Sequence, residues 1–81
     1  MYAAESYTRR PATTIADLAL PLRTAADAVA REGTHVRYVR SLLLPNDEIC
    51  FHLFEADSPA AVGRVSTRAG LRYERILEAV E

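Results

Sequence analysis

The chain has 81 residues, of which 49% are hydrophobic and 26% charged, a composition typical of a folded globular domain and too apolar for a disordered chain. Its 10 basic and 11 acidic residues leave a formal net charge of −1, which argues against nucleic acid and against an anionic membrane as partners. We expect residues 1–81 to form a single domain that gains stability by self-association, because so short a chain buries only about 60–65% of its unfolded surface.

The first half of the chain predicts a strand followed by a helix. Residues 2–8, YAAESYT, can form a strand with Glu5 and Tyr7 on one face. A helix follows, because apolar residues recur at spacings of three and four: Ile15, Leu18, Leu22, Ala25, Ala26 and Val29. Gly33 is placed to end it. Pro21 favours a start with Asp17 as N-cap, since a start at Thr14 would require a kink.

The middle of the chain predicts a β-hairpin. Residues 35–44, HVRYVRSLLL, are rich in β-branched, aromatic and aliphatic side chains, and the short turn PND joins them to EICFHLFE. On the first of these strands, simple alternation puts Arg37 and Arg40 on opposite faces. On the second, Ile49, Phe51 and Leu53 form a wholly apolar face, and Cys50, His52 and Phe54 form a mixed one.

The last third of the chain predicts a second helix and a final strand. Ser58 is a good N-cap and Pro59 fits the first helical position. Ala61, Val62, Val65 and Ala69 then form one apolar stripe, and Gly70 is placed to end the helix. Residues 72–81 can close the sheet as a last strand.

The resulting order, β-α-β-β-α-β, predicts a ferredoxin-like α+β fold with a four-stranded antiparallel sheet and both helices on one face. The other face would be bare, and a large apolar patch is unfavourable on a soluble monomer. Two bare faces packed together would form a dimeric α/β barrel with an interior pocket. We expect the ring of His52 to point to this open face.

The second half of the chain also carries a family resemblance. The segments FEADSPAAV (54–62), AVGRVSTRAG (61–70) and RILEAVE (75–81), within residues 36–81, resemble an actinobacterial family of small ferredoxin-like domains of unknown function. Some members of that family are described as nickel-binding proteins. The use of arginine for all ten basic residues fits a high-GC bacterium.

The resemblance implies the fold, but this chain departs from the nickel-binding branch. That branch has histidines in the first strand, in the first helix, and in the second helix before the RAG motif. Here the first strand offers Tyr7 and Thr8, the first helix has no histidine, and Ser66 stands at the third position.

Cys50 and His52 are the candidate metal ligands. Residues at i and i+2 of a strand project from one side, so the sulfur and nitrogen could converge on Ni²⁺ or Zn²⁺. Two ligands are too few, and Glu5 or a second copy would have to supply the others. The simpler reading is a buried free cysteine beside a hydrogen-bonded histidine.

A ligand pocket is the other candidate on the open face. There His52 could act as a general base beside Glu5 or Tyr7 from the first strand and Tyr38 or Arg40 from the hairpin. Polar residues on such a face are also often dimer contacts or solvated groups.

We therefore expect a homodimeric, cytoplasmic binding domain with a small-molecule or metal site on the open sheet face. The alternative is a dimeric-barrel monooxygenase or isomerase that acts on a small organic molecule, with His52 as general base and Arg40 as anion holder. A purely structural or regulatory dimer is a third reading. The cytoplasmic assignment follows from a single cysteine and from the absence of a signal segment or a membrane-length apolar run.

Overall fold

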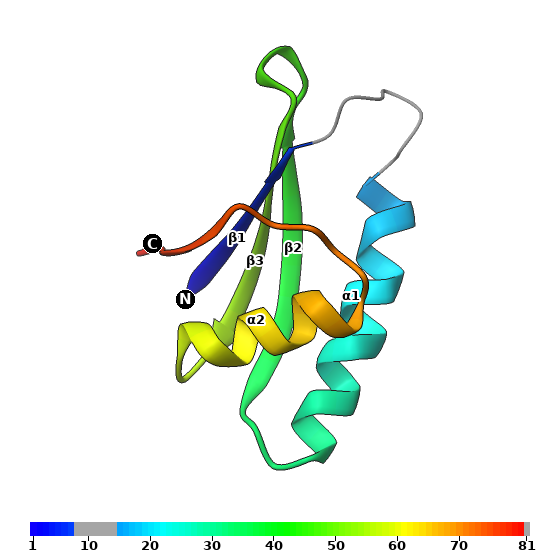
Figure 1. Cartoon of the computed structure of the whole chain (residues 1–81), viewed down its shortest axis with the longest axis vertical. Helices are drawn as coiled ribbons and strands as arrows, with labels where there is room; N and C mark the ends of the chain where they lie inside the picture. The colour runs from blue at the N-terminus through cyan, green and yellow to red at the C-terminus, as the bar shows by residue number, and fades with distance from the viewer. Residues whose placement is uncertain (8–14, 81) are drawn as a thin grey trace.

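The structure is a computed structural model that describes residues 1–7 and 15–80, with the side chains of Ile15 and Ala16 left aside. Its elements follow the predicted order (Figure 1): β1 (Tyr2–Tyr7), α1 (Ile15–Arg31), β2 (Val36–Leu44), the 3₁₀ turn η1 (Pro45–Asp47), β3 (Ile49–Ala56), α2 (Pro59–Arg68) and β4 (Arg75–Glu78). Thr8, the predicted end of the first strand, and Thr14, the alternative helix start, lie outside the described residues.

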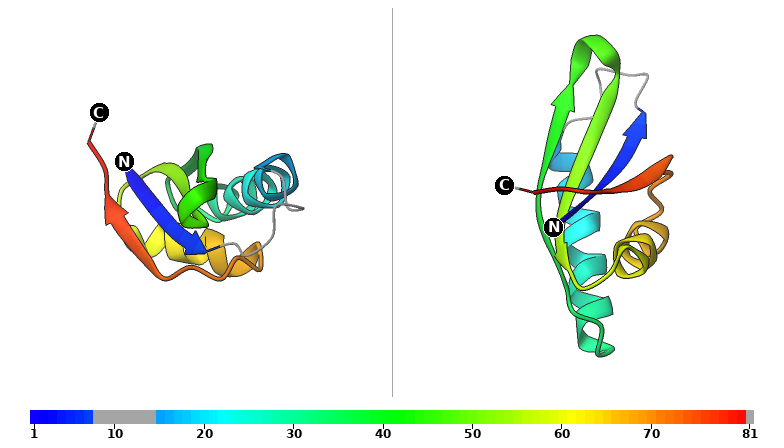
Figure 2. Two further views of the ribbon diagram at one scale, coloured as in Figure 1. Left: turned by 90° about the horizontal axis from the view of Figure 1, so that it is seen from above. Right: turned by 90° about the vertical axis from the view of Figure 1, so that its left-hand side faces the viewer.

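The four strands form one antiparallel sheet in the order β2-β3-β1-β4. The ferredoxin-like α+β fold is therefore confirmed. Figure 2 shows both helices on the same side of this sheet. Neither of the two described α-helices has the length and apolar character that a membrane span requires.

The start of α1 differs from the prediction. The helix already includes Ile15, so Asp17 lies in its first turn instead of capping it, and Pro21 lies inside the helix. An acidic residue in the first turn still interacts favourably with the helix dipole. The predicted end is confirmed, because Gly33 adopts φ 99° and its N–H donates to the carbonyl of Ala30 at 3.0 Å.

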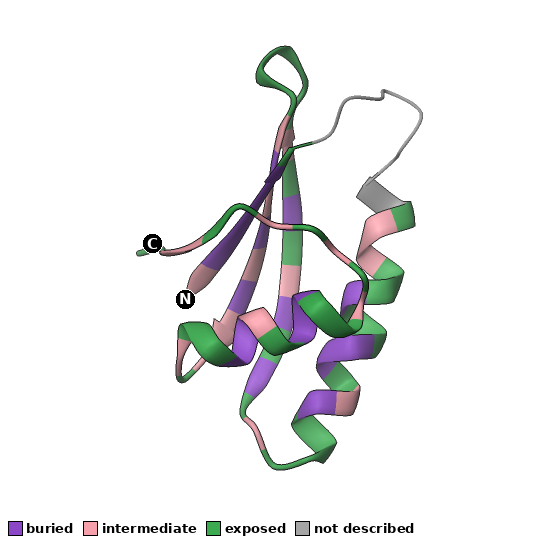
Figure 3. Cartoon of the chain, in the orientation of Figure 1, coloured by how far each residue is buried: buried purple, intermediate pink, exposed green. Residues whose placement is uncertain are grey.

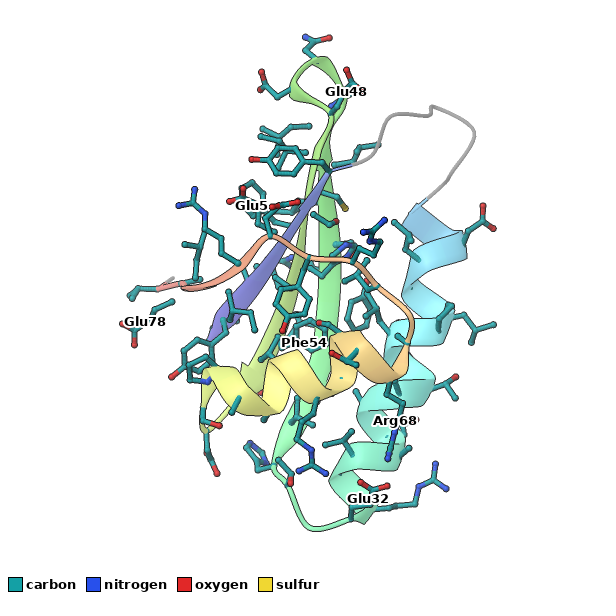
Figure 4. All side chains as sticks on the ribbon, viewed as in Figure 1. Glu5, Glu32, Glu48, Phe54, Arg68 and Glu78 are labelled. Atoms are coloured by element: carbon teal, nitrogen blue, oxygen red, sulfur yellow. The ribbon has the colours of Figure 1, made fainter. Side chains whose placement is uncertain are left out.

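The core lies between the helices and one face of the sheet. Leu22 and Val29 from α1 and Val62 and Val65 from α2 form one core cluster with Phe54 of β3, which is fully buried and labelled in Figure 4. Figure 3 shows buried residues on both helices and on the strands. The other core members from the sheet are Ala4, Val36 and Tyr38.

The face of β3 that meets the helices is the opposite of the one predicted. Side chains alternate along a strand, so Cys50 and His52 lie on the same side as Phe54 and are buried with it. The apolar residues Phe51 and Leu53 lie on the open face. The prediction that His52 points to the open face is therefore wrong.

A β-bulge in β2 corrects a second prediction. The pairing with β3 shifts between Tyr38 and Arg40, so Val39 is the extra residue. Arg37 is opposite Glu55 and Arg40 is opposite Leu53, which places both arginines on the open face. Simple alternation had put them on opposite faces because it takes no account of an inserted residue.

The N-terminus of α2 is built as predicted. Ser58 has an extended backbone, its Oγ accepts a hydrogen bond from the Ala61 N–H at 3.3 Å, and Pro59 occupies the first turn. The hydroxyl therefore satisfies one of the backbone donors that a helix start leaves without a partner.

We expect Ser58→Ala to lower the free energy of unfolding by about 1 kcal/mol, because the Ala61 N–H loses its acceptor. Urea denaturation measures this change as a lower midpoint at an unchanged slope. The exposed residue Thr67 of the same helix provides the control, and Thr67→Ala should stay within about 0.5 kcal/mol of wild type. Equal losses in the two variants would contradict a capping role.

Candidate functional site

The imidazole of His52 is the centre of a buried chain of hydrogen bonds between the sheet and the helices. Its Nε2 lies 3.0 Å from Ser6 Oγ, and its Nδ1 lies 2.7 Å from Ser41 Oγ. Ser41 Oγ in turn lies 2.7 Å from the Tyr38 hydroxyl. The strand register produces this arrangement, since Ser41 is directly opposite His52 on β2.

Both ring nitrogens of His52 therefore have partners. A neutral imidazole has one N–H and one acceptor nitrogen, and a serine hydroxyl can serve either, so the network is satisfied without a charge. Burial lowers the pKa of His52 to about 4, because the site disfavours the imidazolium ion. The ring is thus neutral at physiological pH and a weak general base.

Cys50 lies next to this network. Its Sγ is 3.9 Å from His52 Nδ1, as expected for side chains two residues apart on one strand. Burial raises the pKa of the Cys50 thiol, so the sulfur is held as the protonated form and not as the thiolate that metals and electrophiles require.

These residues do not fit a metal ion within one chain. The nitrogens of His52 are engaged by Ser6 and Ser41, and Ser66 uses its hydroxyl to donate to the Val62 carbonyl at 2.9 Å. No group of three or more His, Cys, Asp or Glu side chains that could hold a metal occurs within residues 1–7 and 15–80. Residues 8–14, TRRPATT, contain none of these types.

The open face carries a different polar group, centred on Glu5. This residue, labelled in Figure 4, is only 3% exposed. Its carboxylate accepts a hydrogen bond from the Tyr7 hydroxyl at 2.8 Å and pairs with Arg75 Nε at 3.0 Å. The Tyr7 hydroxyl and then Arg75 lower the pKa of Glu5, while the carboxylate raises the pKa of Tyr7. Glu5 is therefore held ionised beside Phe51, its neighbour on β3.

The predicted ligand set is divided between the two faces. Glu5, Tyr7 and Arg40 lie on the open face, whereas Tyr38 and His52 lie under the helices. The predicted pairing of His52 as base with Arg40 as anion holder is therefore wrong, since the sheet separates them.

Sequence reasoning missed Ser6, Ser41 and Arg75. Only the strand register identifies them, because Ser41 is the cross-strand partner of His52 and Arg75 is the partner of Glu5. Ser6 lies two residues beyond Ala4, the partner of His52 on β1. Those registers are not readable from one sequence.

The fold and the buried network define a small ferredoxin-like α+β domain with a neutral polar core on one side of the sheet and an uncovered face on the other. Comparison with known proteins then gives the family. Residues 8–79 match the model of the family described as nickel responsive protein SCO4226-like, and the chain belongs to this family.

One solved structure supports the same fold. The crystal structure of SCO4226 from Streptomyces coelicolor A3(2) is similar with a TM-score of 0.71 at 24% identity, over 96% of this chain and 93% of that one. No curated protein matches the chain significantly. The predicted resemblance to an actinobacterial ferredoxin-like family is confirmed.

The depressed pKa of His52 predicts a dependence of stability on pH. The unfolded ring binds a proton near pH 6.5 and the folded one only near pH 4, so stability is complete above about pH 6.5 and falls as pH decreases through this window. Between about pH 7.5 and pH 5 we expect the free energy of unfolding to fall by about 2 kcal/mol, measured by urea denaturation at each pH.

The two histidines of the chain provide the controls for this dependence. His35→Gln, at an exposed position, should keep the pH dependence, and His52→Gln should lose it. Staying above about pH 5 limits the contribution of Glu5 and Glu32, whose pKa values are also lowered. NMR of the folded wild type at pH 5 reports the charge of the His52 ring. A charged ring at this pH would refute the low pKa of His52.

Proposed function

We propose that this chain is a homodimeric binding domain whose two open sheet faces pack against each other and enclose a small ligand. The observation that carries the proposal is the apolar character of the uncovered face. Leu42 is 48% exposed, Leu44 is 40% exposed and Tyr7 is 56% exposed. The half-buried residues Ile49, Phe51, Leu53 and Leu77 continue the same surface.

Self-association would cover this surface in the way the helices cover the other face. Large apolar patches on soluble proteins usually mark interfaces or ligand sites, and a second copy offers the same apolar residues in return. The added burial would also compensate for the small core of an 81-residue chain.

The ligand would lie beside the polar groups of the same face. Glu5 is ionised but covered by Tyr7 and Arg75, so the accessible groups are the Tyr7 hydroxyl and the guanidinium of Arg40, which has no ion pair among the described residues. Arg37 is different, because it pairs with Glu55 at 2.9 Å. A small polar molecule between the two faces would meet this hydroxyl and this positive charge.

We place the domain in the cytoplasm. The free thiol of Cys50 is buried and has no disulfide partner, which fits a reducing compartment.

Oligomeric mass tests this function. We expect wild-type protein to sediment at twice the 9.0 kDa chain mass and Leu42→Arg to sediment as a monomer, because the charge would be buried between the faces. Leu20→Arg is the matched control, since Leu20 is 66% exposed on α1 in the helix layer, and this variant should stay dimeric. A monomeric wild type, or dissociation by both variants, would refute the interface.

The name of the family raises nickel as a ligand, but residues 1–7 and 15–80 hold no group of side chains that fits a nickel ion within one copy. After equilibration with Ni²⁺ and dialysis, we expect elemental analysis to find well below one ion per chain, and the same result with Zn²⁺. The variants Cys50→Ala and His52→Ala should give the same metal content as wild type. If the wild type binds one nickel ion per chain and either substitution removes it, this view is wrong and Cys50 and His52 are nickel ligands.

A further inference from the structure

A cleft on the helix side of the sheet, which shares Tyr7 with the proposed interface, reaches the buried histidine network. It has a volume of about 260 Å³ and lies between the first half of α1, the end of β1 and the turn that joins α2 to β4. Leu18, Leu22 and Leu71 supply apolar lining, and Ser6 and Arg72 also line it. Ser6 is the member of the network that contacts this cleft.

We propose that this cleft binds a small aliphatic or aromatic carboxylate, with its carboxylate group between Arg72 and the Ser6 hydroxyl. The volume lies just below the range of about 300–1,000 Å³ that holds drug-sized ligands, so the ligand is a compact one. The leucines would contact its hydrocarbon part.

The charge of Arg72 selects an anion. Arg72 is exposed and forms no ion pair with the described residues, unlike Arg64 and Arg68, which both pair with Glu32 at 3.1 and 2.7 Å. A guanidinium can bind a carboxylate through two parallel hydrogen bonds, and such charge-assisted bonds are the stronger kind.

The Ser6 hydroxyl has unused hydrogen-bonding capacity. A hydroxyl has one donor and two acceptor positions, and the structure gives Ser6 Oγ a single partner, His52 Nε2. When a carboxylate accepts the Ser6 proton, Ser6 must accept from an Nε2–H. His52 Nδ1 must then accept from Ser41, and Ser41 accepts from Tyr38. Every donor in this chain then points towards the ligand.

One wall of the cleft, the turn after α2, is set before a ligand binds. The turn after α2 is held by hydrogen bonds from the Gly70 N–H to the Thr67 carbonyl at 3.1 Å and from the Leu71 N–H to the Ser66 carbonyl at 2.9 Å. Gly70 adopts φ 76°, which a glycine takes without strain. Little backbone entropy of this turn would therefore be lost on binding.

Titration with butyrate followed by NMR tests the proposal, with butyramide as the uncharged probe of the same shape. We expect saturable shifts at the amides of Ser6, Leu71 and Arg72 with butyrate, and affinity for butyramide weaker by about tenfold or more. When the cleft is filled, His52 should be the Nε2–H tautomer.

The variants separate this site from general attraction of anions. Arg72→Gln and Ser6→Ala should each weaken butyrate binding, the first by about tenfold or more. Arg31→Gln, an exposed arginine at the end of α1, should bind as wild type does. Three results would each overturn the proposal: no saturable shifts, an equal loss of affinity in Arg72→Gln and Arg31→Gln, or an Nδ1–H tautomer of His52 at saturation.

Discussion

The two-residue period of β3 is the constraint on which the rest of the structure depends. Phe54 is the largest fully buried side chain and fills the space between the sheet and both helices. Because alternate residues of a strand share a face, the position of Phe54 brings His52 and Cys50 under the helices as well. The same period turns Phe51 and Leu53 outwards. The buried polar network and the exposed apolar face are thus two consequences of the same orientation of β3.

An imidazole in this position needs partners. Burial of an unpaired polar group costs a few kcal/mol, and an unpaired charge costs more. Ser6 and Ser41 form hydrogen bonds with both ring nitrogens, so no polar atom of the ring is unpaired. The low pKa keeps the ring neutral, so no charge is buried. Every buried side-chain nitrogen and oxygen within the described ranges has a partner. The small residues opposite His52, Ala4 and Ser41, also leave room for the ring.

Local signals in the sequence predicted the elements, but not the sheet orientation. Ser58, Pro59 and Gly33 identify helix ends through backbone chemistry that acts within a few residues, so their predictions held. The choice of covered face depends on contacts between distant segments, and hydrophobicity of β3 alone favoured the wrong side. Phe54 shares its face with His52, but Phe51 on the other face is equally large, so the size of the apolar residues of β3 does not decide which face is covered. The bulge at Val39 likewise depends on pairing between strands.

The alternation along β1 also places the two proposed binding surfaces on opposite sides of this strand, with Tyr7 shared between them. Ser6 faces the helix side and contacts the cleft, whereas its neighbour Glu5 faces the open side. Tyr7 donates to Glu5 and also lines the cleft. A second copy on the open face would therefore contact a residue that a ligand in the cleft also meets, and coupling between the two would pass through Tyr7 and the backbone of β1. By thermodynamic linkage it would act equally in both directions, so ligand binding would change dimer affinity by the factor by which dimerisation changes ligand affinity.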